Sequence, residues 1–340
     1  MSWSVLLFCW LIAPGEAPGT LMDGKLLGHV KSVADTTEIP GTPEVIERRK
    51  YSPDGCMAEY AISTGYEPAK IFISACDGRG NKTEEREYLQ HDNSIRSVTI
   101  YKHDNGGRLT EEQKQDGNGH IKYTLTYTYD QAGQKTERKL MEDGKLSSQH
   151  FYQYDDAGNL ERDSSIEGET KTCDYFRYDA KGRIVEHVSN YYTKNSFSSV
   201  KEASMRDAKG NEIEMLYTDT DTSRNYKRVT IYQDTLPVEI REYKSAGLSS
   251  FRTFAYDKKG RVIETTYHSY LDSQPVSEKN TYKWNEHGDQ TEEAGYKPDG
   301  NLSYQLNYEY IYDTMGNMIR KSRIKDAVRT VLTRRSIEYY

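Results

Sequence analysis

Apolar and polar residues alternate along most of this chain, and short turns interrupt the alternation at regular intervals. Aromatic residues stand four and six positions before the glycine of a turn, as Tyr127 and Tyr129 do before Gly133. Residues two apart lie on one face of a strand. After the glycine, a Thr or β-branched residue and then a Glu begin the next alternating run. This pattern predicts antiparallel hairpins with one packed face and one solvent-exposed face.

The turns share one motif, an aromatic residue followed by Asp, two variable residues and Gly. The Asp can accept hydrogen bonds from the backbone of the turn, and the Gly can adopt positive φ. The clearest copies contain Asp130 and Gly133, Asp155 and Gly158, Asp179 and Gly182, Asp257 and Gly260, and Asp313 and Gly316. Degenerate copies end at Gly80, Gly107, Gly210, Pro237 and Gly288.

Successive motifs are separated by roughly 25 residues, and a period of this size indicates one supersecondary unit that is copied and stacked. A second, less regular turn lies between motifs, for example at Asp143-Gly144 and Asp299-Gly300. We therefore expect an all-β fold, an antiparallel hairpin repeat array of about ten units. Its sheet should be strongly curved or spirally rolled.

The run Tyr-Asp-x-x-Gly-Asn/Arg at 154–159 and 178–183 resembles the YD repeat of the rearrangement-hotspot (RHS) family, of the bacterial exported type. The resemblance covers roughly residues 50–325. It implies a spiralling sheet, in some members a hollow shell, found in surface and secreted proteins and in toxin-encapsulating subunits. The Asp-Pro-x-Gly core signature of self-cleaving members does not occur, and the residues after Gly316 are too few for an effector domain.

The repeats divide the chain into four expected segments. Residues 1–20 contain an apolar run at 5–13 of signal-peptide length, which predicts export to the periplasm, outer surface or extracellular space and no transmembrane span. Residues 21–48 are expected to form a lead-in or N-terminal cap. Residues 49–325 hold the repeats, and residues 326–340 are expected to form a C-terminal edge strand.

Composition favours a thin sheet over a closed globular core. Hydrophobic residues make up 35% of the 340 residues, and 29 residues are Tyr; the mean hydropathy is −0.90. A large apolar core would need more Leu, Ile, Val and Phe. The net charge of −7, with both signs interleaved, argues against nucleic acid as a partner.

The C-terminal end is locally basic. It contains Arg320, Lys321, Arg323, Lys325, Arg329, Arg334 and Arg335. One interpretation is an anion-binding tail, and the other is an edge strand protected from aggregation by its charges.

Three cysteines lie beyond the apolar run, Cys56, Cys76 and Cys173, and their spacing matches neither a disulfide framework nor a zinc site. Free thiols are the default expectation, and a Cys56–Cys76 bridge between neighbouring repeats is the alternative.

No motif for catalysis, metal binding or cofactor binding is found, so we expect no cofactor and no enzyme. The eight His are scattered over different repeats. A Glu four residues after the glycine recurs at Glu84, Glu111, Glu137, Glu186, Glu214, Glu264 and Glu292. If the repeats stack in register, these carboxylates could bind cations or carry out acid–base chemistry. The alternative is that the Glu residues simply occupy the solvent-exposed face of each strand, where nearby Lys or Arg can neutralise their charge.

The aromatic columns carry the functional hypothesis. Exposed Tyr and Trp can stack on sugar rings, although packing between repeats is the competing interpretation. The densest group is Tyr282, Trp284, Tyr310 and Tyr312, our expected ligand-binding residues. We expect a non-catalytic exported scaffold or binding module, with a glycan or another envelope protein as partner. The alternative is a partial shell component of an RHS-type toxin-delivery system.

Overall fold

The computed structural model describes residues 29–53, 56–65, 69–89, 92–245, 247–270 and 276–340, which fold into 24 strands of a single sheet. The strands are β1 (Val30–Glu38), β2 (Val45–Tyr51), β3 (Met57–Ser63), β4 (Lys70–Cys76), β5 (Lys82–Leu89), β6 (Ile95–His103), β7 (Leu109–Asp116), β8 (Ile121–Tyr129), β9 (Lys135–Glu142), β10 (Lys145–Tyr154), β11 (Leu160–Glu167), β12 (Thr170–Tyr178), β13 (Ile184–Tyr192), β14 (Phe197–Arg206), β15 (Glu212–Asp219), β16 (Tyr226–Gln233), β17 (Leu236–Lys244), β18 (Gly247–Tyr256), β19 (Val262–Ser269), β20 (Val276–Trp284), β21 (Gln290–Tyr296), β22 (Leu302–Tyr312), β23 (Met318–Lys325) and β24 (Val328–Tyr339). The helical content of this part of the chain is one 3₁₀ turn, η1 (Thr222–Arg224).

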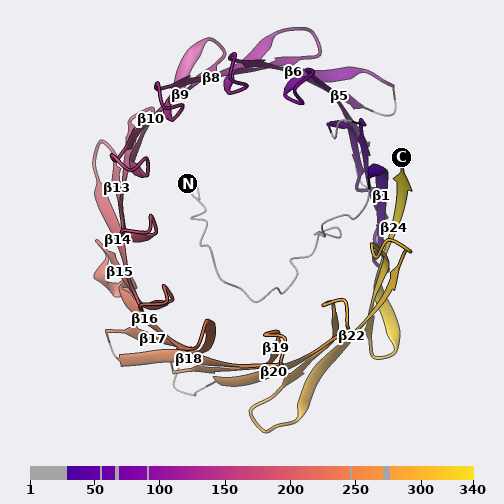
Figure 1. The fold of residues 1–340 in the computed structure, drawn as a ribbon, viewed down its shortest axis with the longest axis vertical. Helices are drawn as coiled ribbons and strands as arrows, with labels where there is room; N and C mark the ends of the chain where they lie inside the picture. The colour runs from indigo at the N-terminus through magenta and orange to yellow at the C-terminus, as the bar shows by residue number, and fades with distance from the viewer. Residues whose placement is uncertain (1–28, 54–55, 66–68, 90–91, 246, 271–275) are drawn as a thin grey trace.

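The sheet closes on itself. Each strand pairs antiparallel with the next, and β24 also pairs with β1, from Val30 opposite Tyr339 to Glu38 opposite Leu332 (Figure 1). The all-β antiparallel prediction is confirmed, whereas the sheet is a closed ring and not an open spiral. The expected edge strand at 326–340 is wrong, because β24 has a hydrogen-bonded neighbour on each side.

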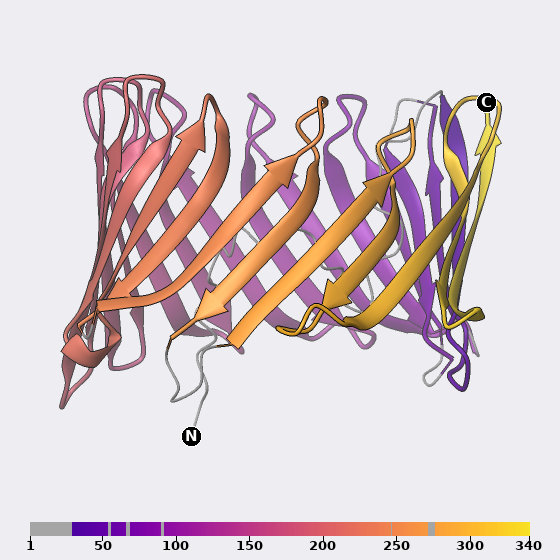
Figure 2. The ribbon, with the colours of Figure 1, turned by 90° about the horizontal axis from the view of Figure 1, so that it is seen from below.

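Because the chain is a meander, every second connection lies on the same rim. The rim at the top of Figure 2 carries the Asp-x-x-Gly turns, and we call it the motif rim. At its tips the glycine N–H donates to the Asp carbonyl, as from Gly182 to Asp179 at 3.0 Å. Gly182 has a φ of 73°, a conformation that costs glycine little and β-branched residues much.

Bulges at the motif rim give a physical reason for the curvature. Every described hairpin that turns there shifts register just before the turn, as between Arg177 and Tyr178 in the β12–β13 hairpin. A β-bulge bends its strand and increases the local twist. The same bend repeated around the sheet brings the first and last strands together.

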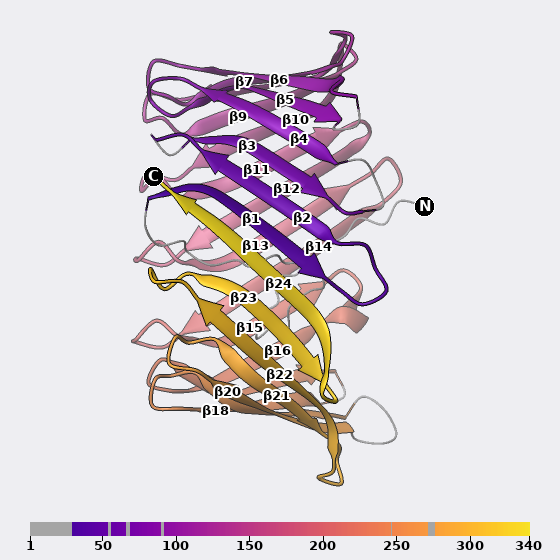
Figure 3. The same cartoon turned by 90° about the vertical axis from the view of Figure 1, so that its right-hand side faces the viewer.

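The ring is too wide for its own side chains to fill. With strands about 4.8 Å apart and tilted by about 40°, 24 strands give a perimeter of about 150 Å and a radius of about 24 Å. The element pairs in substantial contact are neighbours around the ring, so opposite walls do not pack together (Figures 1 and 3). The described strands therefore surround a lumen.

Backbone geometry shows which face lines the lumen. The Asp104 N–H donates to the Arg108 carbonyl at 2.9 Å and so points toward β7. The backbone N–H and C=O groups of successive residues in a strand point alternately to its two neighbouring strands. Those of Tyr101, three residues before Asp104, therefore point toward β5. When a strand of L-residues runs upward and a side chain points toward the viewer, the N–H and C=O groups of that residue point to the right. Seen from the motif rim, the strands follow one another counter-clockwise (Figure 1). The face of Tyr101 is therefore the inner face, and the face of Asp104 the outer one.

The N-terminal expectations have different outcomes. The turn expected at 39–43 joins β1 to β2, with Thr42 N–H donating to Ile39 at 3.0 Å. Residues 30–38 and 45–48 of the expected cap belong to β1 and β2 and pair within the ring. The expected signal peptide at 1–20 lies outside the described residues. Within those residues, no helix has the length and apolar character needed to cross a bilayer.

Cys56 and Cys76 form a disulfide, so the default expectation of free thiols is wrong for this pair. The bridge joins the β2–β3 connection to the end of β4, two neighbouring positions on the motif rim. Cys173 is a free, buried thiol.

Candidate functional site

Aromatic side chains of the inner wall join several repeats to the repeat before them by hydrogen bonds. Tyr178 donates its hydroxyl to the Leu160 carbonyl at 2.7 Å, and Trp284 donates its indole N–H to Val262 at 2.7 Å. Each acceptor is two residues beyond the preceding motif glycine. The same contact joins Tyr129 to Leu109, and related contacts join Tyr256 to Pro237 and Tyr310 to Gln290. The sequence pattern thus encodes an inter-repeat clamp.

Burial raises the pKa values of the clamp residues Tyr129, Tyr178 and Tyr256, which keeps their hydroxyls protonated and able to donate. It raises the pKa of Tyr101 to about 12, with smaller contributions from the charges of Glu85 and Glu112. Burial also raises the pKa values of Tyr123 and Tyr304, whose hydroxyls donate to Glu112 at 2.6 Å and Glu293 at 2.7 Å.

The four residues expected to bind ligand lie together on the inner face, on β20 and β22 with β21 between them. All four are half-buried. Trp284 and Tyr310 donate to wall carbonyls, and Tyr312 donates to the Asp289 carboxylate and accepts from Asn285. The His287 ring also stacks on Tyr312 with 4.0 Å between ring centroids. The polar atoms of Trp284, Tyr310 and Tyr312 are therefore engaged in hydrogen bonds within the wall.

Cations cover several rings of the inner wall. Lys135 Nζ lies 4.7 Å from the centre of the Tyr127 ring, and Lys321 Nζ lies 5.5 Å from that of Tyr308. Such contacts hold positive charge on the aromatic surface.

Charge is unevenly distributed around the inner wall. On β23, Lys321, Arg323 and Lys325 face inward opposite Tyr310, Tyr308 and Leu306. The acidic residues of β22–β24, Glu309 and Glu338, have the opposite phase and face outward.

Carboxylates gather on the inner wall across the ring, on β11–β14. Asp163 and Asp174 are register partners on β11 and β12. His150 and His187 contact them with nitrogen–oxygen distances of 3.4 and 2.9 Å. Burial raises the pKa of Asp163, His150 opposes this rise, and Asp174 adds to it.

On the outer face, the recurrent Glu column is neutralised. Each of the seven carboxylates lies within ion-pair distance of a Lys or Arg on its own or a neighbouring strand. The pairs are Glu84–Arg86, Glu111–Lys102, Glu137–Lys139, Glu186–Lys201, Glu214–Lys227, Glu264–Lys279 and Glu292–Lys283. An alternating ladder of ion pairs is a solvated wall surface.

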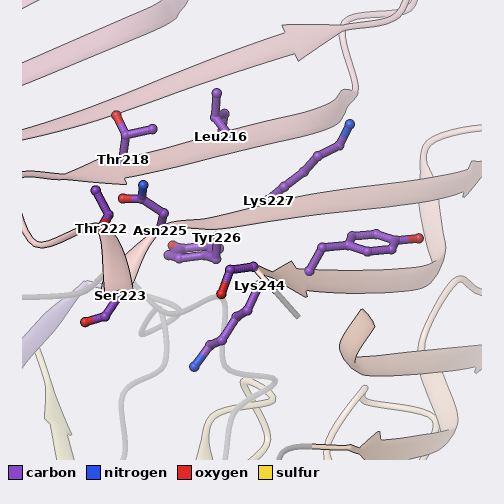
Figure 4. A pocket seen from close by; sticks show the side chains of 10 residues that line it. Leu216, Thr218, Thr222, Ser223, Asn225, Tyr226, Lys227 and Lys244 are labelled. Atoms are coloured by element: carbon purple, nitrogen blue, oxygen red, sulfur yellow. The ribbon is translucent and has the colours of Figure 1, made fainter. Parts of the chain in front are cut away.

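A shallow open pocket lies beside η1, which connects β15 and β16 (Figure 4). Leu216, Thr218 and Lys227 line it, and Lys227 pairs with Glu214 at 2.6 Å. Thr222 and Ser223 of η1 supply hydroxyls at its edge. Tyr226 and Tyr243 also line it, and the Ser223 hydroxyl donates to the Asp221 carboxylate at 2.7 Å.

The motif rim is a continuous polar belt. The residue after a motif glycine often bonds the next tip, as from Gln134 to the Gly158 carbonyl at 3.0 Å and from Arg261 to Asn285 at 2.7 Å. Hydrogen bonds from Arg183 lower the pKa of Asp179 to about 2, with help from the Lys181 backbone. In the described ranges, no cluster of three or more His, Cys, Asp or Glu has metal-binding geometry.

No protein-family model matches this chain, and no curated protein matches it. Among solved structures, the Photorhabdus luminescens Tc holotoxin pore with a TccC3-D651A mutation aligns at 10% identity and a TM-score of 0.36, covering 83% of this chain and 17% of that one. The TcdB2–TccC3 structure aligns at 9% identity and a TM-score of 0.35, covering 84% and 19%. A porin-like protein from Bacteroides uniformis aligns at 12% identity and a TM-score of 0.23, covering 91% and 96%.

This chain thus spans less than a fifth of the length of the two toxin chains. TM-scores this low record a loose likeness among β-rich chains and carry no argument about function.

Two features of the inner wall escaped the sequence reasoning. The first is the Asp35–Arg335 pair, which joins residues 300 positions apart and has no local signal. The second is the inward orientation of Lys321, Arg323 and Lys325 in the basic C-terminal segment. Its signal was present, because Lys321, Arg323 and Lys325 alternate in sequence and thus share one face of a strand.

Proposed function

We propose that this chain is a non-catalytic, exported ring that forms part of a shell around a polypeptide cargo. The observation that carries the proposal is the closed antiparallel ring with its tyrosine face turned toward the lumen. Closure leaves no sheet edge for a partner strand. A partner therefore binds to a face of the sheet or to a rim, and the inner face carries the tyrosine columns.

Polypeptide fits this wall better than carbohydrate, our first expectation. A sugar site needs polar groups that orient hydroxyls, and those of Trp284, Tyr310 and Tyr312 are engaged within the wall. The rings themselves remain half-exposed to the lumen. Aromatic rings and their covering cations suit the mixed apolar and amide surface of an unfolded chain.

Two further observations support the proposal. The Asp-x-x-Gly hairpin tips resemble those of RHS repeats, a family with hollow shells. The Cys56–Cys76 disulfide is of the kind that persists in oxidising compartments, which agrees with export. Alkylation of protein taken directly from its host should leave both cysteines unmodified, and modification of both would argue against export.

The test uses an unfolded, uncharged polypeptide carrying a fluorophore, with binding measured by anisotropy. Tyr127→Ala removes an inner ring, and Tyr175→Ala removes an outer ring that is 40% exposed. We expect the inner variant to bind more weakly and the outer variant to bind like the wild type. Equal effects of both variants, or no binding by the wild type, would refute a cargo-holding lumen. A glycan array with the same variants tests carbohydrate directly.

A further inference from the structure

The Cys56–Cys76 disulfide stands where other repeats have an aromatic clamp. Cys76 lies four residues before Gly80, the motif position from which Tyr178 and Trp284 reach back to the preceding repeat. Its partner, Cys56, directly follows the glycine of the preceding turn on the same rim. This junction is therefore closed by a covalent bond that a reductant can open, whereas the aromatic clamps are hydrogen bonds.

The disulfide fixes the end of β2. The Ser52 N–H donates to the Cys56 carbonyl at 2.8 Å, and the Ser52 hydroxyl donates to the same oxygen at 3.2 Å. Because Cys56 is bonded to Cys76 at the end of β4, the end of β2 is tied to a strand two places further from the seam. Both cysteines are only half-buried and lie at a rim, where a small dithiol in solvent can approach them.

The end of β2 also anchors the β1–β24 seam at the motif rim. Tyr340, which follows β24, donates its hydroxyl to the Tyr51 carbonyl. His29, which precedes β1, contacts the Pro53 carbonyl with a nitrogen–oxygen distance of 3.2 Å. The Tyr340 N–H donates to the His29 carbonyl at 3.1 Å, and the centroids of the two rings lie 4.8 Å apart. Both residues that flank the seam at this rim thus rest on the segment that the disulfide fixes.

The seam depends on such contacts more than any other strand pair. Among the described strands, each neighbouring pair except β1 and β24 is also joined by a connection of the chain. The Asp35–Arg335 ion pair holds the middle of the seam, and the contacts of His29 and Tyr340 hold its motif-rim end. A change at the end of β2 should therefore free the rim end of the seam first.

We propose that the Cys56–Cys76 disulfide is a redox-controlled latch for the seam between β1 and β24. A dithiol reductant supplies two electrons and two protons, so that the S–S bond breaks, two cysteine thiols form and the reductant leaves as its own disulfide. The end of β2 then loses its tie to β4, and Tyr340 and His29 lose their fixed base. The ring stays closed in an oxidising compartment and loosens at the motif rim in a reducing one. Release of a polypeptide from the lumen by this opening rests on the proposed function.

Hydrogen–deuterium exchange of the full chain, measured by mass spectrometry of its peptides, tests the latch directly. We expect a dithiol to speed exchange about tenfold in Val30–Glu38 and Val328–Tyr339 and to change it less than about twofold in β11–β13. Cys56→Ser with Cys76→Ser should exchange at the seam like the reduced wild type and should not respond to the dithiol. Tyr178→Phe is the matched control, because it removes a hydrogen-bond clamp away from the seam and should leave the response of the seam to the dithiol intact.

Unchanged exchange at the seam on reduction would overturn the latch. Equal acceleration in all strands would also overturn it, because that result indicates a general loss of stability. If the double serine variant does not fold, reduction of the folded wild type still decides between these outcomes. A seam that loosens on reduction, in a ring that does not bind the uncharged unfolded probe, would support the latch and refute the cargo-holding function.

Discussion

The seam between β1 and β24 is held by a buried ion pair, and removing one of its members is the sharpest perturbation of the ring. Arg335 donates to both oxygens of Asp35, at 2.6 and 2.9 Å. Only 3% and 1% of the two side chains are exposed. Arg49 lies 3.6 Å from the same carboxylate and also pairs with Glu47 at 2.8 Å. The pair lies on the inner face where the first and last strands meet.

Arg335→Met leaves Asp35 charged and buried. Removing one partner of a buried pair costs about 3–5 kcal/mol. Arg49 still offers some compensation, so we expect a loss near the lower end, about 3 kcal/mol. Asp35→Leu combined with Arg335→Met leaves no uncompensated charge and should cost much less, because well-packed apolar pairs replace buried ion pairs with little loss.

Urea unfolding followed by circular dichroism measures the effect. Lys31→Met is the matched control, since the Lys31–Glu338 pair crosses the same seam at 2.8 Å but is 49% and 59% exposed. An exposed pair contributes about 0–1 kcal/mol. The reasoning is refuted if Arg335→Met and Lys31→Met lower the urea midpoint equally, or if the double substitution is as damaging as Arg335→Met.

Three further outcomes concern the repeats. Gly182→Val should cost about 1–3 kcal/mol and Gly182→Asn less, because Asn tolerates the φ of 73° far better; equal thermal midpoints would contradict this. Tyr178→Phe should cost about 1 kcal/mol by leaving the Leu160 carbonyl without its donor, and an unchanged urea midpoint would contradict the clamp. Asp179 has a pKa lowered from 3.8 to about 2, so its stabilisation is present above pH 4 and is lost as pH falls toward 2. Asp179→Asn should therefore reduce the loss of stability measured over that range.

The local structure could be predicted from sequence because its signals are local. The Asp and Gly of each turn specify a hairpin tip within a few residues, as at Asp179 and Gly182. The shared face of Tyr127 and Tyr129 follows from a spacing of two, whereas the inward direction of that face required the structure. These signals repeat, so the all-β meander and the common rim of the motif turns could be inferred.

Closure could not be predicted, because it depends on small bends that accumulate over 24 strands. A slightly different bend at each bulge gives a spiral instead of a ring, and no residue encodes the sum. The final match of β24 to β1 depends on Asp35 meeting Arg335, far apart in sequence. The role of the aromatic group around Trp284 likewise required knowledge of the Val262 carbonyl as its partner.

The measurement that tests the ring most directly is a cysteine cross-link across the seam. Ala34 and Ser336 are register partners on β1 and β24 and lie on the outer face. With Cys9 and Cys173 replaced by serine, Ala34→Cys with Ser336→Cys should form an intramolecular disulfide on mild oxidation, because facing Cα atoms are about 4.5–5.5 Å apart. The control, Ala34→Cys with Ser199→Cys on β14, should remain reduced. Failure of the Ala34–Ser336 pair to cross-link in folded monomer would contradict a closed ring and favour an open spiral.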